Sequence, residues 1–320
     1  MGCCPSAPNS GDEDASGTNI NYPHPSAEGT TPFRQYSLAE IMAATDGFSW
    51  DNIIAKGGGT IPNYVFRGRL PETQQIAVKR FSKNAWPDVE QFRKEAIRAG
   101  RLRHRRLVNL IGYCCDKDER LLVAEFMPND SLDYRLFNAK NKTMEWSMRL
   151  RVACYIAEAL EYCSNIEGQA LYHDLSPYKI LFDEADNPCL SCFGLVKNHR
   201  NGRYYCSPYM PPECRSGMIT PKSMIFGLGY MIRDLVSGRQ IPQDHEMLEM
   251  VVGKQIPIRP DSRLKGEYSA EDATALLELA SQCMRHKPND RPTIKDVIAT
   301  LAQVQSNAAG PSNAGDSEGT

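Results

Sequence analysis

The apolar residues of this chain have the spacing of strands in its first half and of helices in its second, and this order limits the folds open to it. Strand-like runs occupy residues 63–70, 75–81, 107–115 and 120–126. One helix is predicted among them, beginning near Asp88 and placing Val89, Phe92 and Ala96 on one face. The later apolar stripes, over residues 152–163 and 275–283, have helical spacing. A small sheet with one helix, followed by a helical half, is an α+β arrangement.

Composition divides the 320 residues into an ordered body and two polar ends. Residues 1–32 are rich in Pro, Gly, Ser and Asn and are predicted to form a disordered tether, and residues 305–320 a disordered tail. The body between them, about 270 residues long, suits one two-lobed domain. We place its first lobe, which includes an N-terminal extension, at residues 33–126 and its second lobe at residues 127–304.

Charge, hydropathy and cysteine usage exclude several classes of partner. The formal net charge is −2, so the chain as a whole does not attract nucleic acid, and no nucleic-acid partner is predicted. No apolar run approaches the roughly 18 residues of a membrane span. The eleven cysteines are odd in number and scattered, which is typical of reduced cytosolic thiols, and none has the spacing of zinc ligands. No bound structural metal is therefore predicted.

The amino terminus predicts lipid attachment. Gly2 becomes the first residue once Met1 is removed, Ser6 completes the myristoylation pattern, and Cys3 and Cys4 offer thiols for palmitate. One myristoyl chain holds a protein at a membrane only marginally, and the first 33 residues contain no Lys or Arg to assist it. We therefore predict palmitoylation of Cys3 or Cys4 as the second signal. The alternative is a chance match in a disordered leader.

A series of short motifs makes the expected fold specific. Lys79 ends an Ile-Ala-Val-Lys strand, and Glu95 follows on the predicted helix. Further motifs come in this order: Tyr-His-Asp-Leu at 172–175, Cys-Phe-Gly at 192–194, Pro-Pro-Glu at 211–213 and Arg-Pro at 291–292. The series resembles protein kinases, in which the Lys contacts the α- and β-phosphates of ATP and pairs with the Glu. The resemblance implies a two-lobed kinase fold, with a small, mainly β N-lobe and a larger, mainly α C-lobe.

Longer strings resemble a narrower group, the receptor-like cytoplasmic kinases of plants and, most closely, the brassinosteroid-signalling kinases. These strings lie at residues 1–4, 34–48, 76–81, 120–129, 170–175 and 190–195. The resemblance implies a lipid-anchored place at the cytoplasmic face of the plasma membrane, with upstream receptor kinases that phosphorylate the protein and downstream signalling proteins as partners. The group usually carries tetratricopeptide repeats after the kinase domain. This chain is too short to hold them, so contacts made through the repeats are not expected.

The positions that handle magnesium and the phosphates in a kinase are altered. Cys192 replaces the metal-binding Asp, and Lys179 replaces the Asn that binds the second metal ion. Magnesium requires oxygen ligands, whereas Cys offers a soft sulfur and Lys a positive charge. Ser176 replaces the loop Lys, and His173 replaces the Arg that orders a phosphorylated activation segment. Ordinary magnesium binding is therefore not expected, and manganese is kept as an alternative metal.

The loop that covers the phosphates is also degraded. Its three glycine positions hold Gly58, Thr60 and Asn63, and Pro62 removes a backbone donor from a loop that acts by donating hydrogen bonds. On a later helix, Met224 stands where the family has the buried Asp that braces the catalytic loop. The changed loop weakens the expected hold on phosphate, and the missing brace is interpreted as dispensable here.

Other positions of the nucleotide site survive. Asp174 is the candidate proton acceptor, and a loop-bracing role is its alternative. ATP is retained as a candidate ligand, because Lys79, Glu95 and the hinge residues Glu125 and Met127 match the nucleotide-binding positions of kinases, and Gly58 remains in the phosphate loop. The alternative for Lys79 and Glu95 is a structural link between helix and sheet.

Three further features are singled out. Ala124, at the gatekeeper position, predicts a roomy back of the adenine pocket. Glu213 and Arg291 resemble the buried structural ion pair of the family. Residues 93–106 contain seven Lys or Arg residues and one Glu. This basic segment is interpreted either as a solvated helix face or as a dock for an acidic partner or an anionic membrane.

These residues predict a membrane-anchored pseudokinase adaptor that relays plant receptor kinase signalling, such as brassinosteroid signalling, chiefly by binding. Two alternatives stay open. One is a weak or atypical ATP-dependent serine/threonine kinase that uses Lys79 and Asp174, and the other is a nucleotide-gated switch without catalysis. Whether the protein is an enzyme is not decided by the residues.

Overall fold

The computed structural model describes residues 32–57, 63–71, 74–82, 85–165, 175–196, 209–216, 218, 220–240 and 258–308. The chain divides into two units, Met1–Thr31 and Pro32–Thr320, and every described residue belongs to the second. Among the described residues, no helix combines the length and apolar character needed to cross a membrane.

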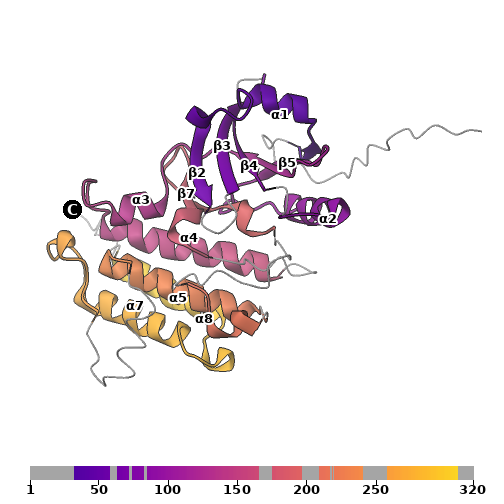
Figure 1. Cartoon of the computed structure of the whole chain (residues 1–320). Coiled ribbons are helices and arrows are strands. Elements are labelled where there is room, and N and C mark those ends of the chain that lie inside the picture. Colours follow the sequence, from indigo (N-terminus) through magenta and orange to yellow (C-terminus); the bar gives the residue numbers. More distant parts are fainter. Residues whose placement is uncertain are drawn as a thin grey trace, which may run out of the picture. The chain divides into compact units, whose positions relative to one another are not determined.

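The N-lobe is built on one six-stranded sheet, with strand order β1-β5-β6-β4-β3-β2 (Figure 1). β1 pairs parallel to β5 and all other pairs are antiparallel. The predicted strands at 63–70, 75–81, 107–115 and 120–126 are confirmed as the four central ones, and the continuous apolar runs of β5 and β6 are buried on both faces. The strands are β1 (Arg34–Gln35), β2 (Ile53–Gly57), β3 (Asn63–Arg69), β4 (Gln75–Arg80), β5 (Leu110–Cys114) and β6 (Leu121–Glu125).

The N-terminal extension covers one face of this sheet. Helix α1 (Leu38–Ala44) begins at Ser37, whose side chain and that of Glu40 form a capping box. Its buried Ile41 and the preceding Tyr36 join a cluster of sheet residues that includes Ile76, Val78, Ile111 and Val123. Gly112 makes the close approach of β1 feasible, because a Cβ there would lie 2.2 Å from the carbonyl oxygen of Arg34.

Helix α2 (Val89–Gly100) packs beside β5 on the other side of the lobe (Figure 1). It starts at the predicted place, where the Asp88 side chain accepts a hydrogen bond from the backbone N–H of Gln91. Its buried Phe92 stacks edge-on with Phe81 and Trp86, and this aromatic group belongs to the main core that continues into the C-lobe. The core therefore ties the position of α2 to the rest of the domain.

The C-lobe is mainly helical, as predicted. Helix α5 lies at its centre, because every residue from Ser223 to Ser237 is buried, and α4 and α7 pack against it (Figure 1). Helix α8 runs four residues beyond Val304, its last buried apolar residue, to Ala308. The helices are α3 (Leu132–Phe137), α4 (Trp146–Asn165), α5 (Pro221–Ser237), α7 (Ala270–Cys283) and α8 (Ile294–Ala308), and two short strands, β7 (Ile180–Phe182) and β8 (Pro188–Leu190), form a hairpin.

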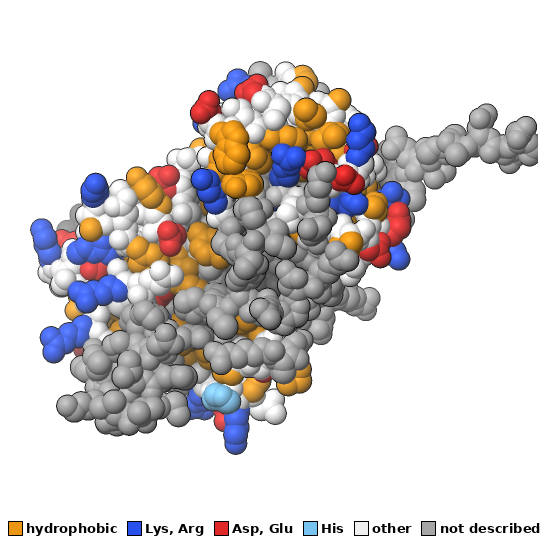
Figure 2. All heavy atoms as spheres, viewed as in Figure 1, with side chains coloured by type: hydrophobic (Ala, Val, Ile, Leu, Met, Phe, Trp, Pro, Cys, Tyr) orange, Lys and Arg blue, Asp and Glu red, His pale blue; other side chains and the backbone are white. Residues whose placement is uncertain are grey.

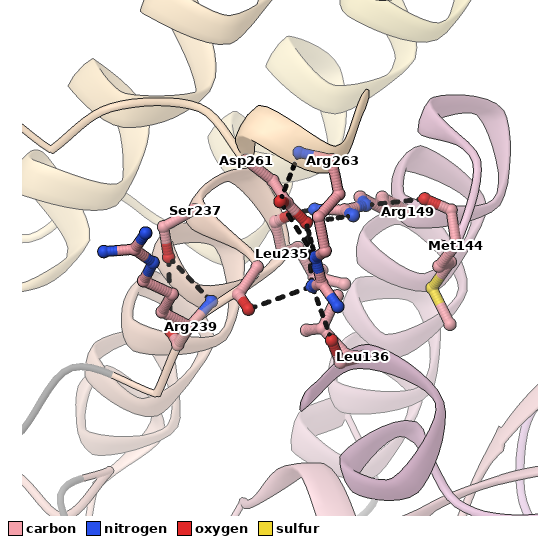
Figure 3. A network of polar contacts seen from close by, with 9 residues as sticks. Leu136, Met144, Arg149, Leu235, Ser237, Arg239, Asp261 and Arg263 are labelled. Carbon is pink, nitrogen blue, oxygen red and sulfur yellow. Dashed lines mark hydrogen bonds and ion pairs between the residues drawn. The ribbon is translucent and has the colours of Figure 1, made fainter. Parts of the chain in front are cut away.

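A polar network fastens α4 to the chain that follows α5 (Figure 3). Arg149 is 1% exposed and donates hydrogen bonds to Asp261 at 2.6 Å and to the carbonyl oxygen of Leu235 at 2.8 Å. Arg263 reaches the same carboxylate at 2.8 Å. Burial alone would raise the pKa of Asp261, but the hydrogen bonds from Arg263 and Arg149 reverse this and lower it to about 2. The carboxylate is therefore ionised between two guanidinium groups.

Hydrophobic side chains also gather on the surface over β2 and β3 (Figure 2). Trp50 and Ile54 are the exposed apolar side chains of this region, and the Trp50 ring contacts Tyr64 edge-on at 5.6 Å. β2 is the outermost strand of the sheet, so these residues border its free edge.

Candidate active site of a kinase fold

The Cys-Phe-Gly motif forms a tight turn after β8. Residues Cys192–Gly194 make a single 3₁₀ turn that begins at Ser191, whose hydroxyl accepts a hydrogen bond from the Phe193 backbone N–H at 3.4 Å. The Ser191 backbone N–H in turn donates to the carbonyl oxygen of Lys179 at 2.8 Å. The two predicted metal-handling positions, Cys192 and Lys179, are thus brought close together by the backbone.

Cys192 is buried and uncharged. Its side chain is 2% exposed, and burial, with a smaller effect from the Glu125 carboxylate, raises the pKa of the thiol to about 12 although Lys79 and Arg103 act in the opposite direction. At physiological pH the thiol is therefore protonated. It presents neither the oxygen nor the negative charge that a hard metal ion requires.

Lys79 projects from β4 toward this turn. Its Nζ lies 4.8 Å from the ring centre of Phe81 and 5.7 Å from that of Phe193, the central residue of the Cys-Phe-Gly turn. Lys79 is paired in register with Val65 of β3, the strand that follows the degraded phosphate loop. β4 thus brings the Lys79 ammonium near the Cys-Phe-Gly turn, and its contact with a nucleotide phosphate stays a prediction.

Glu95 lies on α2 and has a partner that sequence reasoning missed. Arg98, one turn further along, donates to the Glu95 carboxylate at 2.6 Å and to the carbonyl oxygen of Leu195 at 3.1 Å. The predicted pairing of Glu95 with Lys79 stays a prediction. The i, i+3 spacing of Glu95 and Arg98 on the predicted helix is a signal that could have found their ion pair. The contact with Leu195 has no such signal, because it is 97 residues away in the sequence.

The hinge between the lobes begins at Glu125, the last residue of β6. Asn109 donates to both carboxylate oxygens of Glu125, at 3.1 and 3.0 Å, and its carbonyl oxygen accepts the Glu125 backbone N–H at 3.1 Å. Met127 is half-buried against the main core, and Ala124 is fully buried on β6. Asn109 is a second site residue that the sequence did not reveal, and it anchors the hinge from the strand side.

The loop before β7 contains two more predicted positions. Ser176 is completely buried, and its Oγ has no hydrogen-bond partner among the described residues. Lys179 ends a 3₁₀ turn over Pro177–Lys179 and is half-buried, with its Nζ 5.7 Å from the ring centre of Tyr178. Asn63 starts β3 and pairs in register with Gly57. The remaining predicted positions lie outside the described residues, namely Gly2, Cys3, Cys4, Gly58, Thr60, Pro62, His173 and Asp174.

The described residues do not fit magnesium in the way a kinase site does. A protonated thiol at Cys192 and an ammonium at Lys179 replace two oxygen ligands, and among residues that the structure describes no group of three or more His, Cys, Asp or Glu side chains is arranged to hold a metal ion. The charges that act on Cys192 are mixed, since the Glu125 carboxylate opposes Lys79 and Arg103. Burial outweighs the two cations, so the turn supplies no charged ligand for a metal ion.

One structural ion pair of the C-lobe is kept, and one bracing position is changed. Arg291 and Glu213 form the predicted buried ion pair through two hydrogen bonds of 2.6 and 2.9 Å, and the Ser223 hydroxyl donates to the same carboxylate at 2.9 Å. Met224, which replaces the bracing Asp, is buried in the main hydrophobic core. The C-lobe thus holds an apolar contact where the family has a buried carboxylate.

The basic segment at 93–106 is largely occupied by internal contacts. Arg106 and Arg105 both pair with Glu158, at 3.1 and 3.4 Å. Arg103 is half-buried and donates to two backbone carbonyl oxygens, and burial lowers the pKa of its guanidinium. Acidic and basic side chains alternate on the visible surface over α2 (Figure 2). These contacts favour the interpretation as a solvated, structural face, and a charge reversal that includes Arg103 would disturb the fold.

Comparison with known proteins agrees with this geometry. Residues 57–301 match the family described as "Protein kinase domain". The chain belongs to the protein kinase family.

Within that family the chain is similar to plant brassinosteroid-signalling kinases. It is 53% identical over 283 residues to serine/threonine-protein kinase BSK1 of Arabidopsis thaliana, an alignment that covers 88% of this chain and 55% of the relative. It is 51% identical over 287 residues to BSK1-2 of Oryza sativa subsp. japonica, with 88% and 55% covered, and 48% identical over 276 residues to BSK6 of Arabidopsis thaliana, with 85% and 56% covered. The chain spans about half the length of these curated relatives. The resemblance predicted from the sequence is confirmed.

Proposed function

We propose that this protein is a membrane-anchored pseudokinase adaptor, which relays plant receptor kinase signalling, such as brassinosteroid signalling, by binding and not by phosphoryl transfer. The observation that carries the proposal is the buried, protonated thiol of Cys192 at the position of a metal-binding carboxylate. Phosphoryl transfer depends on metal ions that neutralise the charge developing on the phosphates. A neutral thiol supplies no such ligand.

The contrast between the altered and intact positions supports the same proposal. The Glu213–Arg291 pair and the buried helix α5 keep the architecture of the C-lobe. Most departures from the family pattern fall at positions that manage metal and phosphate, and His173 and Met224 are the others. A chain that keeps its fold-bearing contacts and lacks its metal ligands is suited to binding partners.

The membrane and partner components of the proposal rest on the sequence and on the relatives. Gly2, Cys3 and Cys4 form the proposed lipid anchor, which would hold the protein at the cytoplasmic face of the plasma membrane. Upstream receptor kinases and downstream signalling proteins are the proposed partners, with the protein itself as a receptor kinase substrate. The similarity to the brassinosteroid-signalling kinases supports this assignment.

A weak serine/threonine kinase is the second candidate. The placement of Lys79 beside Phe193 favours it, because this cation lies where a kinase holds the phosphates of ATP. The relatives also bear the name of serine/threonine-protein kinases. In this candidate Asp174 accepts the proton of the substrate hydroxyl, and manganese would be the metal that assists.

The two candidates are separated by measuring nucleotide binding and phosphate transfer with purified full-length protein. Binding of ATP is measured without metal, with magnesium and with manganese, and transfer is then compared between the wild type and Asp174→Asn. The adaptor proposal expects no transfer above the level of the Asn variant in either metal. Transfer that requires Asp174 would overturn it and establish the kinase candidate. Lys79→Met serves as the control that removes the nucleotide-binding cation.

A further inference from the structure

Arg98 joins two segments whose relative position governs the state of a kinase fold. It lies in the last turn of α2, and its Nη2 donates at once to Oε2 of Glu95 (2.6 Å) and to the carbonyl oxygen of Leu195 (3.1 Å). The second acceptor directly follows the Cys192–Gly194 turn. One guanidinium group therefore connects the helix to the turn across the interior of the domain.

The acceptor at Leu195 is held in a fixed place by its own surroundings. Leu195 is 1% exposed and belongs to the main core, and its backbone N–H donates to the carbonyl oxygen of Cys192 at 3.0 Å. On the helix side, Arg98 and Glu95 are 31% and 21% exposed, so the ion pair is only partly in contact with solvent. Hydrogen bonds from a charged donor in such a position are stronger than those of an exposed pair.

In an active kinase the docking of this helix against the turn depends on ligands. The Lys–Glu ion pair and the metal-bound Asp of the Asp-Phe-Gly turn must both be in place, and phosphorylation of the activation segment and movement of the helix control them. Cys192 removes the metal-dependent part of that arrangement. The buried Phe92, Ala96 and Ala99 still pack α2 into the main core, but apolar packing is not directional, so a polar contact is needed to fix the helix against the turn when the site is empty.

We propose that Arg98 is a latch that keeps α2 docked against the Cys192–Gly194 turn without nucleotide, metal or phosphorylation. The planar guanidinium suits this role, since the two N–H groups of Nη2 point in fixed directions and hold both acceptors, whereas the N–H groups of a Lys ammonium rotate freely on a shorter stem. The surface formed by α2 and the turn is then presented in one conformation at all times. The latch is a positioning device and does not depend on the adaptor role: a weak kinase would use the same contact.

Hydrogen–deuterium exchange on the full-length protein tests the latch. Arg98→Ala should speed amide exchange by about tenfold in both residues 89–100 and residues 191–196, because a hydrogen bond to a charged group contributes about 1.5 kcal/mol or more. Arg98→Lys keeps the positive charge on the helix and should show a smaller increase in both segments. Lys94→Ala, an exposed position on the same helix, is the matched control and should leave both segments unchanged.

Two outcomes would overturn the proposal. Faster exchange in α2 alone after Arg98→Ala would reduce Arg98 to a helix-surface pair with Glu95 and overturn the latch. In the wild type, exchange in both segments should be the same with and without ATP and either metal. Protection of α2 that appears only when ATP and manganese are added would also overturn the proposal, because docking would then depend on ligand. If Arg98→Ala does not fold, the comparison of Arg98→Lys with Lys94→Ala decides the question.

Discussion

Replacing Cys192 with Asp restores the residue type that a kinase uses for magnesium, yet we expect the substitution to destabilise the fold and not to restore phosphoryl transfer. The surroundings of Cys192 raise the pKa of its thiol from 9.0 to about 12, chiefly by burial, with Glu125 adding to the effect. Lys79 and Arg103 lower the pKa but do not compensate. The position therefore disfavours an anion even with two cations near it.

The size of this effect follows from the pKa of the thiol. A change from 9.0 to about 12 corresponds to about 4 kcal/mol against the anion, at about 1.4 kcal/mol for each pKa unit. An aspartate carboxylate in the same place meets a similar penalty, so its folded-state pKa is raised above the unfolded value. The folded state then holds the proton more tightly, and the penalty grows as pH rises from the unfolded pKa to the folded pKa. We expect a loss of about 4 kcal/mol at pH 8 and a loss of less than half that size at pH 5.

Urea unfolding of Cys192→Asp and of its neutral counterpart Cys192→Asn measures this penalty. The difference between the two variants removes the effects of size and polarity that they share, and only the charge remains. Magnesium-dependent transfer should stay absent in the Asp variant, because Lys179 and Ser176 still occupy the other altered positions. Equal stability of the two variants at pH 8, together with strong magnesium-dependent transfer, would refute the reasoning.

Two further predictions concern the C-lobe. Asp261→Asn should lower the free energy of unfolding by about 2 kcal/mol at pH 7, because the hydrogen bonds from Arg149 and Arg263 depress the pKa of this carboxyl from 3.8 to about 2. A carboxyl whose pKa is lower in the folded state stabilises the fold above its unfolded pKa, and this stabilisation is lost as pH falls. In chemical denaturation, the difference in unfolding free energy between the variant and the wild type should therefore be constant between pH 7 and 5 and disappear below about pH 4. Asp186→Asn, at a more exposed ion pair, is the control and should change stability by less than about 1 kcal/mol. An equal loss in both variants would contradict the stabilising role given to the two arginines around Asp261. Gly238→Ala should lower stability by about 2 kcal/mol or more in the same assay, because the residue has φ of +64° and the added Cβ would lie 2.0 Å from Oδ2 of Asp261; a neutral effect would show that the network tolerates displacement.

Local patterns were sufficient for the central elements of the fold. The strands β3 to β6 and helix α2 follow from apolar spacing, and Asp88 marks the helix start because its side chain satisfies a free backbone N–H. The motif series also placed Lys79 and the Cys-Phe-Gly turn in one site, and the ring of Phe193 near Lys79 agrees with that prediction. These successes share a cause, since each depends on residues close together in sequence or on a motif of fixed order.

Other parts of the site depend on contacts that no local pattern records. Asn109 binds the Glu125 carboxylate from 16 residues away, and Arg98 reaches Leu195 across 97 residues. The basic segment at residues 93–106 also depends on contacts with residues distant in the sequence. Its composition left a solvated face and a docking surface both open, and Glu158 of α4, which pairs with Arg105 and Arg106, favours the first.

The sequence by itself determined that the metal-handling positions are altered, because the identity of Cys192, Lys179 and Ser176 is independent of any contact. Tertiary structure decided how firmly the thiol of Cys192 holds its proton. A thiol with the ordinary pKa of 9.0 is already mostly protonated at pH 7, and burial raises that pKa to about 12, because desolvation of a charge depends on everything around the group. In the same way, the sequence supplied an arginine at position 98, and only the folding of Leu195 against α2 made that arginine a link between the helix and the turn.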